Sequence, residues 1–130
     1  MLHWTSLVTL LAVAAYFWTG VMVARARSRH GVKAPATMGD PDFERVFRVQ
    51  QNMLEWMPIF LPSLWLFAVY VGDHWAALVG LVWIGGRVLY MRDYAAAAEL
   101  RGRGFSIQAL ACGLLFVGAA IGLAWRLLLG

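Results

Sequence analysis

Charged and amide side chains gather in one stretch of an otherwise apolar sequence, FERVFRVQQNMLEWMP at residues 43–58. At about 100° per residue of α-helix, all of these side chains except Gln50 fall within a stripe about 120° wide. A charge at mid-bilayer costs about 2.5–3.5 kcal/mol, so a stripe leading into the apolar run 57–71 cannot simply face lipid. It must face protein, a water-filled cavity or a polar ligand. The side chains of this stripe are Glu44, Arg45, Arg48, Gln51, Asn52 and Glu55.

A second polar stripe lies on the third apolar segment of the chain. With Arg87 set at 0°, Tyr90, Tyr94 and Arg101 fall at about 300°, 340° and 320°, so all four share one face of a helix. Arginine guanidinium groups bind carboxylates through paired hydrogen bonds, and the carboxylate of Glu55 can pair with an amine. Together the two stripes suit a ligand that has several carboxylates and an amine.

Two simpler interpretations apply to single residues of these segments. Glu55 could pair with an arginine only to neutralise its charge so that the helix can fold in a membrane. Arg92 and Asp93 fall off the face that Arg87 defines, and we expect them to be local surface charges.

The composition is typical of an integral membrane protein. The chain has 130 residues, of which 62% are hydrophobic and 14% are charged, and a soluble domain of this size has too little interior for that. The net charge of +4 could indicate nucleic-acid binding, but the basic residues lie beside apolar segments, which favours a role in membrane topology. The single cysteine, Cys112, excludes an intrachain disulfide. The three histidines show no metal-ligand spacing, and we expect no metal.

Four apolar segments are long enough to cross a bilayer. They cover about residues 2–24, 43–71, 75–100 and 105–129, and we expect one all-α domain over residues 1–130, a four-helix transmembrane bundle. Basic residues follow the first segment instead of preceding it, which favours a retained helix over a cleaved signal peptide. Asp40 or Asp42 can cap the second helix, beside Pro41.

The basic residues predict the topology. They follow the first and third segments, which places both connections in the cytoplasm and both termini outside. The second helix then enters the membrane with its polar stripe first, and the third returns with its polar stripe last. Both stripes therefore meet at the cytoplasmic face of the membrane, which would be the inner membrane in a bacterium.

The stretch FERVFRVQQNMLEWMP and, about thirty residues later, GRVLYMRDYAAAAELR resemble the MAPEG family, the membrane-associated proteins in eicosanoid and glutathione metabolism. The resemblance is closest to the branch that holds leukotriene-C synthase and microsomal glutathione transferase. The four segments and the basic first loop agree with it over nearly the whole chain. The resemblance implies a homotrimer of four-helix subunits, with glutathione bound as co-substrate between neighbouring subunits near the cytoplasmic face.

Site residues carry over from the family by position. Gln50 would reach the site of a neighbouring subunit, as would an arginine of the first loop. Arg27 fits that arginine best by spacing, although Arg25 or Arg29 could serve. Trp56 stands where close relatives have a tyrosine, so that a hydroxyl contact with glutathione is either lost or replaced by the indole N–H. Ser28 stands where they have a second proposed catalytic arginine. The family's glutathione contacts within one subunit match Arg48, Asn52, Glu55, Tyr90, Tyr94 and Arg101, and the last of these matches the arginine that activates the thiol.

The resemblance implies a glutathione transferase that acts on hydrophobic electrophiles or lipids, with glutathione-dependent reduction of hydroperoxides as a side activity. The alternative is a non-catalytic lipid-binding scaffold of the same fold. The scaffold protein of the family lacks the arginines that match Arg48 and Arg101, so the two present here favour the enzyme. A transporter or channel is disfavoured because the polar stripes lie at one membrane face and do not cross it. We expect membrane lipids and further copies of the chain as partners, and no nucleic acid.

Overall fold

The computed structural model describes all 130 residues, which form four long helices, one short 3-10 turn and no strands. All four helices are long and apolar enough to cross a membrane, which confirms the expected all-α membrane bundle. The elements are α1 (His3–His30), α2 (Pro41–Tyr70), α3 (Asp73–Ala96), η1 (Ala98–Leu100) and α4 (Gly102–Leu129).

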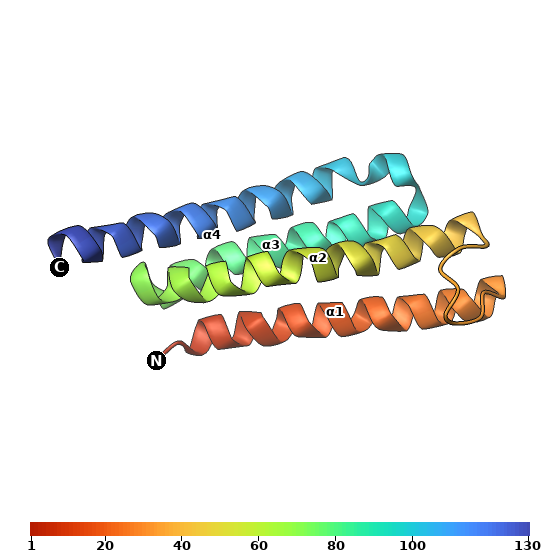
Figure 1. Cartoon of the computed structure of the whole chain (residues 1–130), viewed down its shortest axis with the longest axis horizontal. Coiled ribbons are helices and arrows are strands. Elements are labelled where there is room, and N and C mark those ends of the chain that lie inside the picture. Colours follow the sequence, from red (N-terminus) through yellow and green to blue (C-terminus); the bar gives the residue numbers. More distant parts are fainter.

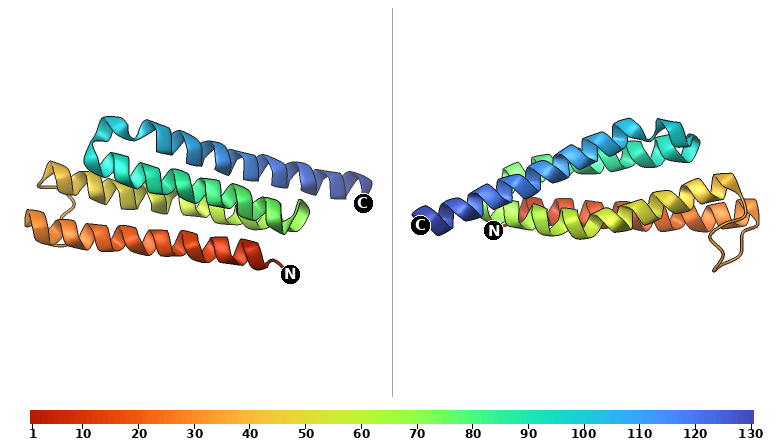
Figure 2. Two further views of the ribbon diagram at one scale, coloured as in Figure 1. Left: turned by 180° about the vertical axis from the view of Figure 1, so that it is seen from behind. Right: turned by 45° about the horizontal axis from the view of Figure 1, so that its top comes forward.

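The helices run side by side, each antiparallel to the next, and both termini lie at one end of the bundle (Figure 1). α2 and α3 lie between α1 and α4, and the most extensive contact joins α3 to α4 (Figures 1 and 2). The α1–α2 and α3–α4 connections share the end opposite the termini (Figure 1). The start of α2 and the end of α3 therefore lie together, as the two polar stripes predicted.

Local sequence signals explain the start of α2 and the end of α1, but not the end of α3. Asp40 is the N-cap of α2, since its side chain accepts hydrogen bonds from the backbone N–H groups of Asp42 (2.9 Å) and Phe43 (3.0 Å). α1 continues through the basic residues to Gly31, whose φ of 68° is left-handed and ends the helix. α3 ends at Ala96, four residues before the expected position, although Ala95–Ala98 contain no stop signal.

Close backbone contact between α3 and α4 explains that early end. A Cβ atom on Gly104 would lie 2.4 Å from the backbone nitrogen of Tyr90, and one on Gly86 would lie 2.7 Å from that of Gln108. Gly104 lies against Tyr90 and Gly86 against Gln108, so both pairs are centred on residue 97 and the chain must reverse its direction there. The 3-10 turn makes this reversal and sets the first residues of α4 beside Tyr90.

At the end of the bundle that holds the termini, a carboxylate of α3 caps the start of α1. Asp73, the first residue of α3, accepts hydrogen bonds from the backbone N–H of Trp4 (3.1 Å) and from the N–H (2.8 Å) and hydroxyl (2.7 Å) of Thr5. α1 has no capping side chain of its own, so Asp73 satisfies its first free N–H groups. This contact holds α1 and α3 in register.

Candidate functional site

A row of three polar side chains marks the first half of α2. Arg48, Asn52 and Glu55 are four and three residues apart, so they lie on one face of the helix. Arg48 Nη2 lies 3.7 Å from Glu55 Oε1, and the side chains are 54% and 56% exposed. Ion pairs this exposed contribute at most about 1 kcal/mol, so both groups remain available to a ligand. The pair therefore gives little support to the interpretation that Glu55 is present only to be neutralised.

The two polar stripes join through Arg87. This residue is fully buried in α3, and its Nη1 donates a hydrogen bond of 2.6 Å to Asn52 Oδ1 in α2. Its guanidinium carbon lies 4.6 Å from the ring centre of Tyr90. The sequence placed Arg87 on the shared face without assigning it a ligand contact. In the structure it lies behind Asn52 and joins α3 to α2.

Aromatic rings continue the site from α3 to the start of α4. The rings of Tyr90 and Tyr94 are 5.4 Å apart, and the guanidinium carbon of Arg101 lies 5.6 Å from the Tyr94 ring centre. Arg101 is exposed and is the N-cap of α4, where no side chain caps the free N–H groups. The positive end of the α4 dipole therefore adds to the charge of Arg101, and an anion is favoured there.

Trp56 lies at the α4 side of this site. Its ring meets Phe105 edge-on, with centroids 5.7 Å apart and planes at 80°, and Phe105 in turn lies 6.2 Å from Tyr90. The indole therefore helps to pack the start of α4 against α2. A contact between Trp56 and a ligand, which the family pattern suggested, stays a prediction.

The expectation that Asp93 is a surface charge is wrong. Asp93 is 7% exposed and accepts two hydrogen bonds from Arg103, at 2.7 and 3.3 Å. The early end of α3 turns the first residues of α4 back over Asp93, and helical periodicity within α3 could not show this. The pair anchors the segment that holds Arg101, two residues before Arg103. Arg92 is exposed, as expected.

The residues expected to act across a subunit interface lie apart from the row in the single chain. Gln50 Nε2 lies 3.6 Å from the Cβ position of Gly20, between α2 and α1. Arg27 lies against its own loop, where Nη1 donates to the carbonyl of Ala36 at 2.7 Å. Arg25 and Arg29 line a hollow of about 550 Å³ at the same end of the bundle. All three arginines lie in the last turns of α1 and not in the loop where they were expected, because the helix continues to His30. Which of them reaches a neighbouring site stays a prediction.

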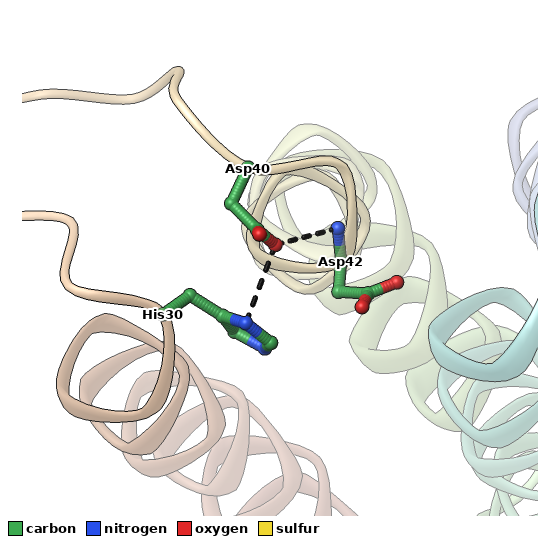
Figure 3. A group of neighbouring side chains, drawn as sticks. All are labelled: His30, Asp40 and Asp42. Carbon is green, nitrogen blue, oxygen red and sulfur yellow. Dashed lines mark hydrogen bonds and ion pairs between the residues drawn. The ribbon is translucent and has the colours of Figure 1, made fainter.

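The fold also gathers three potential metal ligands, which the sequence spacing did not indicate. His30, Asp40 and Asp42 offer ligand atoms within 4.8 Å of one another (Figure 3). His30 Nδ1 lies 3.4 Å from Asp40 Oδ1, the same oxygen that caps α2. Asp42 forms an ion pair with Arg45. Both carboxylates have partners, so the cluster is explained as the clamp that joins the end of α1 to the start of α2.

These observations define a class: a four-helix membrane protein with arginine, asparagine and tyrosine side chains of α2, α3 and the start of α4 gathered at one end of its bundle. Residues 5–121 match the model of the MAPEG family. The chain is 43% identical to leukotriene C4 synthase of Cavia porcellus, over 89% of this chain and 77% of that protein. It is 39% identical to human microsomal glutathione S-transferase 2, over 90% of this chain and 80% of that protein. An uncharacterised protein of Synechocystis is 48% identical, over 97% of this chain and 92% of that protein. The chain belongs to the MAPEG family.

Proposed function

We propose that this protein is a membrane-bound glutathione transferase that adds the thiolate of glutathione to hydrophobic electrophiles. The observation that supports it most is a chain of contacts. It runs from Asn52, which lies between Arg48 and Glu55 on α2, through Arg87 and the tyrosines of α3 to Arg101 at the start of α4. The similarity to a microsomal glutathione S-transferase supports the same ligand.

This site has the groups that glutathione requires. The tripeptide bears two carboxylates, one ammonium group and one thiol. Arg48 can bind a carboxylate through two hydrogen bonds, and Glu55 can accept from the ammonium group. Asn52 and the hydroxyl group of the partly buried Tyr94 can hydrogen-bond to the peptide groups or to a carboxylate. Tyr90 is 2% exposed in the single chain, so its expected contact with glutathione stays a prediction. No metal is needed for this binding.

Arg101 would stabilise the thiolate. A free thiol has a pKa of about 8.5, so only a few per cent is ionised at neutral pH. Lowering that pKa to about 6.5 would raise the thiolate fraction roughly 25-fold, while the weaker basicity would cost roughly 8-fold in nucleophilicity. The net gain is only about threefold, so most of the rate enhancement must come from holding the thiolate beside the electrophile.

The reaction forms one bond and breaks one bond at the electrophile. The thiol releases its proton to water, the sulfur forms a carbon–sulfur bond, and an aryl halide loses its halide. In the reduction of a hydroperoxide, the same thiolate would take the outer oxygen, giving an alcohol and the sulfenic acid of glutathione. A second glutathione would then convert the sulfenic acid to glutathione disulfide and water. The second half of α2 is apolar, so an electrophile that dissolves in the membrane could approach this sulfur along it.

We further propose that the site is completed in a homotrimer at the cytoplasmic face, with both termini outside. Arg48 and Glu55 are more than half exposed on the single chain, directly before the apolar part of α2. Lipid cannot solvate these charges, so a ligand and a neighbouring subunit should cover them. Gln50 and Arg27 of that neighbour are the expected contributors.

A lipid-binding scaffold is the second candidate. It is favoured by an apolar hollow of about 580 Å³ between α1 and α3, lined by Trp18, Met22 and Met91 among others. Such a hollow could hold an acyl chain without any chemistry. Catalytic activity distinguishes the two candidates.

The decisive experiment is a conjugation assay on protein purified in detergent, with glutathione and a generic aryl halide. We expect a rate that saturates with glutathione and depends on the amount of protein. Arg101→Ala serves as the control, because it removes the thiolate-stabilising charge from an exposed position. A folded parent protein that conjugates no faster than buffer would contradict the enzyme and favour the scaffold.

A further inference from the structure

Arg87 is the most deeply buried charge of the bundle. Its side chain is fully buried, and no carboxylate forms an ion pair with it. Nη1 bonds to Asn52, whereas Nε and Nη2 have no hydrogen-bond partner. A buried charge without a counter-charge is unfavourable, and more so within a helix that can cross a membrane. An anion bound nearby would offset this cost.

The bond from Arg87 decides which way the Asn52 amide faces. An arginine side chain has donors only, so the atom that it contacts at 2.6 Å must be the amide oxygen. The NH₂ group of Asn52 then faces away from Arg87, and it has two hydrogens to donate. Without Arg87, the amide could rotate and present its oxygen instead. The row on α2 therefore offers a cation at Arg48, a donor at Asn52 and an acceptor at Glu55.

The charge of Arg87 also acts on what Asn52 binds. Arg48 lies 3.7 Å from the Glu55 carboxylate, which weakens its field. Arg87 is shielded from water and not neutralised, and it polarises the amide through the hydrogen bond. A ligand group beside Asn52 is therefore favoured when it is an anion that accepts hydrogen bonds.

We propose that Arg87 is a positioning residue that makes Asn52 a carboxylate-binding group of the site. This proposal rests on the proposed function, in which glutathione supplies the carboxylate. Arg87 itself lies behind Asn52 and acts through its amide. The site thus selects an ionised carboxylate at this position and disfavours a neutral or cationic group.

A double-mutant cycle tests this role. The variants are Arg87→Met, Asn52→Ala and the double variant, with glutathione affinity measured by titration calorimetry in detergent. Arg87→Met should weaken binding about tenfold in the parent, the effect of one charge-assisted contact, and less than twofold when Asn52 is already alanine. Arg87→Lys should recover part of the affinity, because an ammonium group can still donate to the amide. The conjugation rate at saturating glutathione should change less than its KM, because Arg101 is untouched.

Asn52→Asp separates positioning from stability. An aspartate would give Arg87 the counter-charge that it lacks, so the thermal unfolding temperature should be no lower than that of Asn52→Ala. It would also remove the donor and repel a carboxylate, so glutathione should bind more weakly than it binds to Asn52→Ala. Binding by Asn52→Asp that equals binding by the parent would overturn the proposal.

The outcomes also distinguish this proposal from the proposed function. A folded parent that does not bind glutathione would refute the function and, with it, the role of Arg87. The parent could instead bind glutathione, with Arg87→Met lowering the affinity equally in the parent and in Asn52→Ala. That result would leave the proposed function intact, refute the positioning role of Arg87 and show that its role is structural.

Discussion

Arg101 and Arg48 are both exposed arginines of the proposed site, but they should have different effects on the kinetics. Arg101 lies at the start of α4, where the helix dipole adds to its charge. We expect Arg101→Ala to lower the conjugation rate well over tenfold, because both thiolate stabilisation and the position of the sulfur are lost. Glutathione affinity should weaken by only about 1–2 kcal/mol. The ultraviolet absorbance of the thiolate on adding glutathione should appear in the parent and be absent in the variant.

Arg48→Ala is the matched comparison at the residue scale. It removes a carboxylate contact from α2 and leaves the start of α4 unchanged. The glutathione concentration needed for half the maximal rate should rise, while the rate at saturation and the thiolate absorbance should change little. Full activity and an unchanged absorbance in Arg101→Ala would show that Arg101 is only a helix-end charge.

At the element scale, the position of α4 depends on a glycine. A Cβ on Gly104 would lie 2.4 Å from the backbone of Tyr90, which cannot move aside as a flexible side chain can. Gly104→Ala should therefore push the start of α4 away from α3 and destabilise the protein by about 1–3 kcal/mol. Activity should fall with it, because Arg101 moves away from Tyr94. Thermal unfolding in detergent and the conjugation rate measure the two effects.

Gly113→Ala is the control in the same helix. No atom lies within 4 Å of its Cβ position, so alanine should be tolerated and should favour the helix by up to about 1 kcal/mol. Equal stability of the Gly104→Ala and Gly113→Ala variants would show that the close α3–α4 contact is not required.

At the scale of the assembly, a shared site predicts complementation between inactive subunits. In a cyclic trimer each site would use Arg48 of one subunit and Gln50 of the next. Random mixing of Arg48→Ala and Gln50→Ala subunits should restore roughly a quarter of the sites. Mixing Arg48→Ala with Arg101→Ala subunits is the control, because both residues belong to the same subunit's part of the site and no complete site can form. Absence of recovery in verified mixed trimers would argue against sharing.

The whole chain also predicts a topology that can be measured. The α1–α2 connection and the C-terminus lie at opposite ends of the bundle (Figure 1). Reporter fusions after Lys33 and at Gly130 should therefore report opposite compartments, with the Lys33 fusion in the cytoplasm. The same compartment for both fusions would contradict four membrane-crossing helices.

The sequence by itself determined the helices, their order and the end of the bundle at which polar groups gather. Helical periodicity is a local property, so it placed Arg48, Asn52 and Glu55 on one face without knowledge of their neighbours. The antiparallel order of adjacent helices then required the stripes of α2 and α3 to meet. The N-cap at Asp40 followed from short-range chemistry, with Asp42 as the alternative that the structure excludes.

Only the tertiary structure decided which polar groups pair. The Asn52–Arg87 bond depends on the rotation of α2 against α3, and the burial of Asp93 depends on α4 turning back at Ala96. The second follows from the close backbone contact of α3 and α4 at Gly86 and Gly104, between residues that are distant in sequence. Periodicity gives the direction of a side chain about its own helix axis, but not which helix packs against it or how closely. The pairings therefore required the folded bundle, and the roles of Gln50 and Arg27 require a second subunit as well.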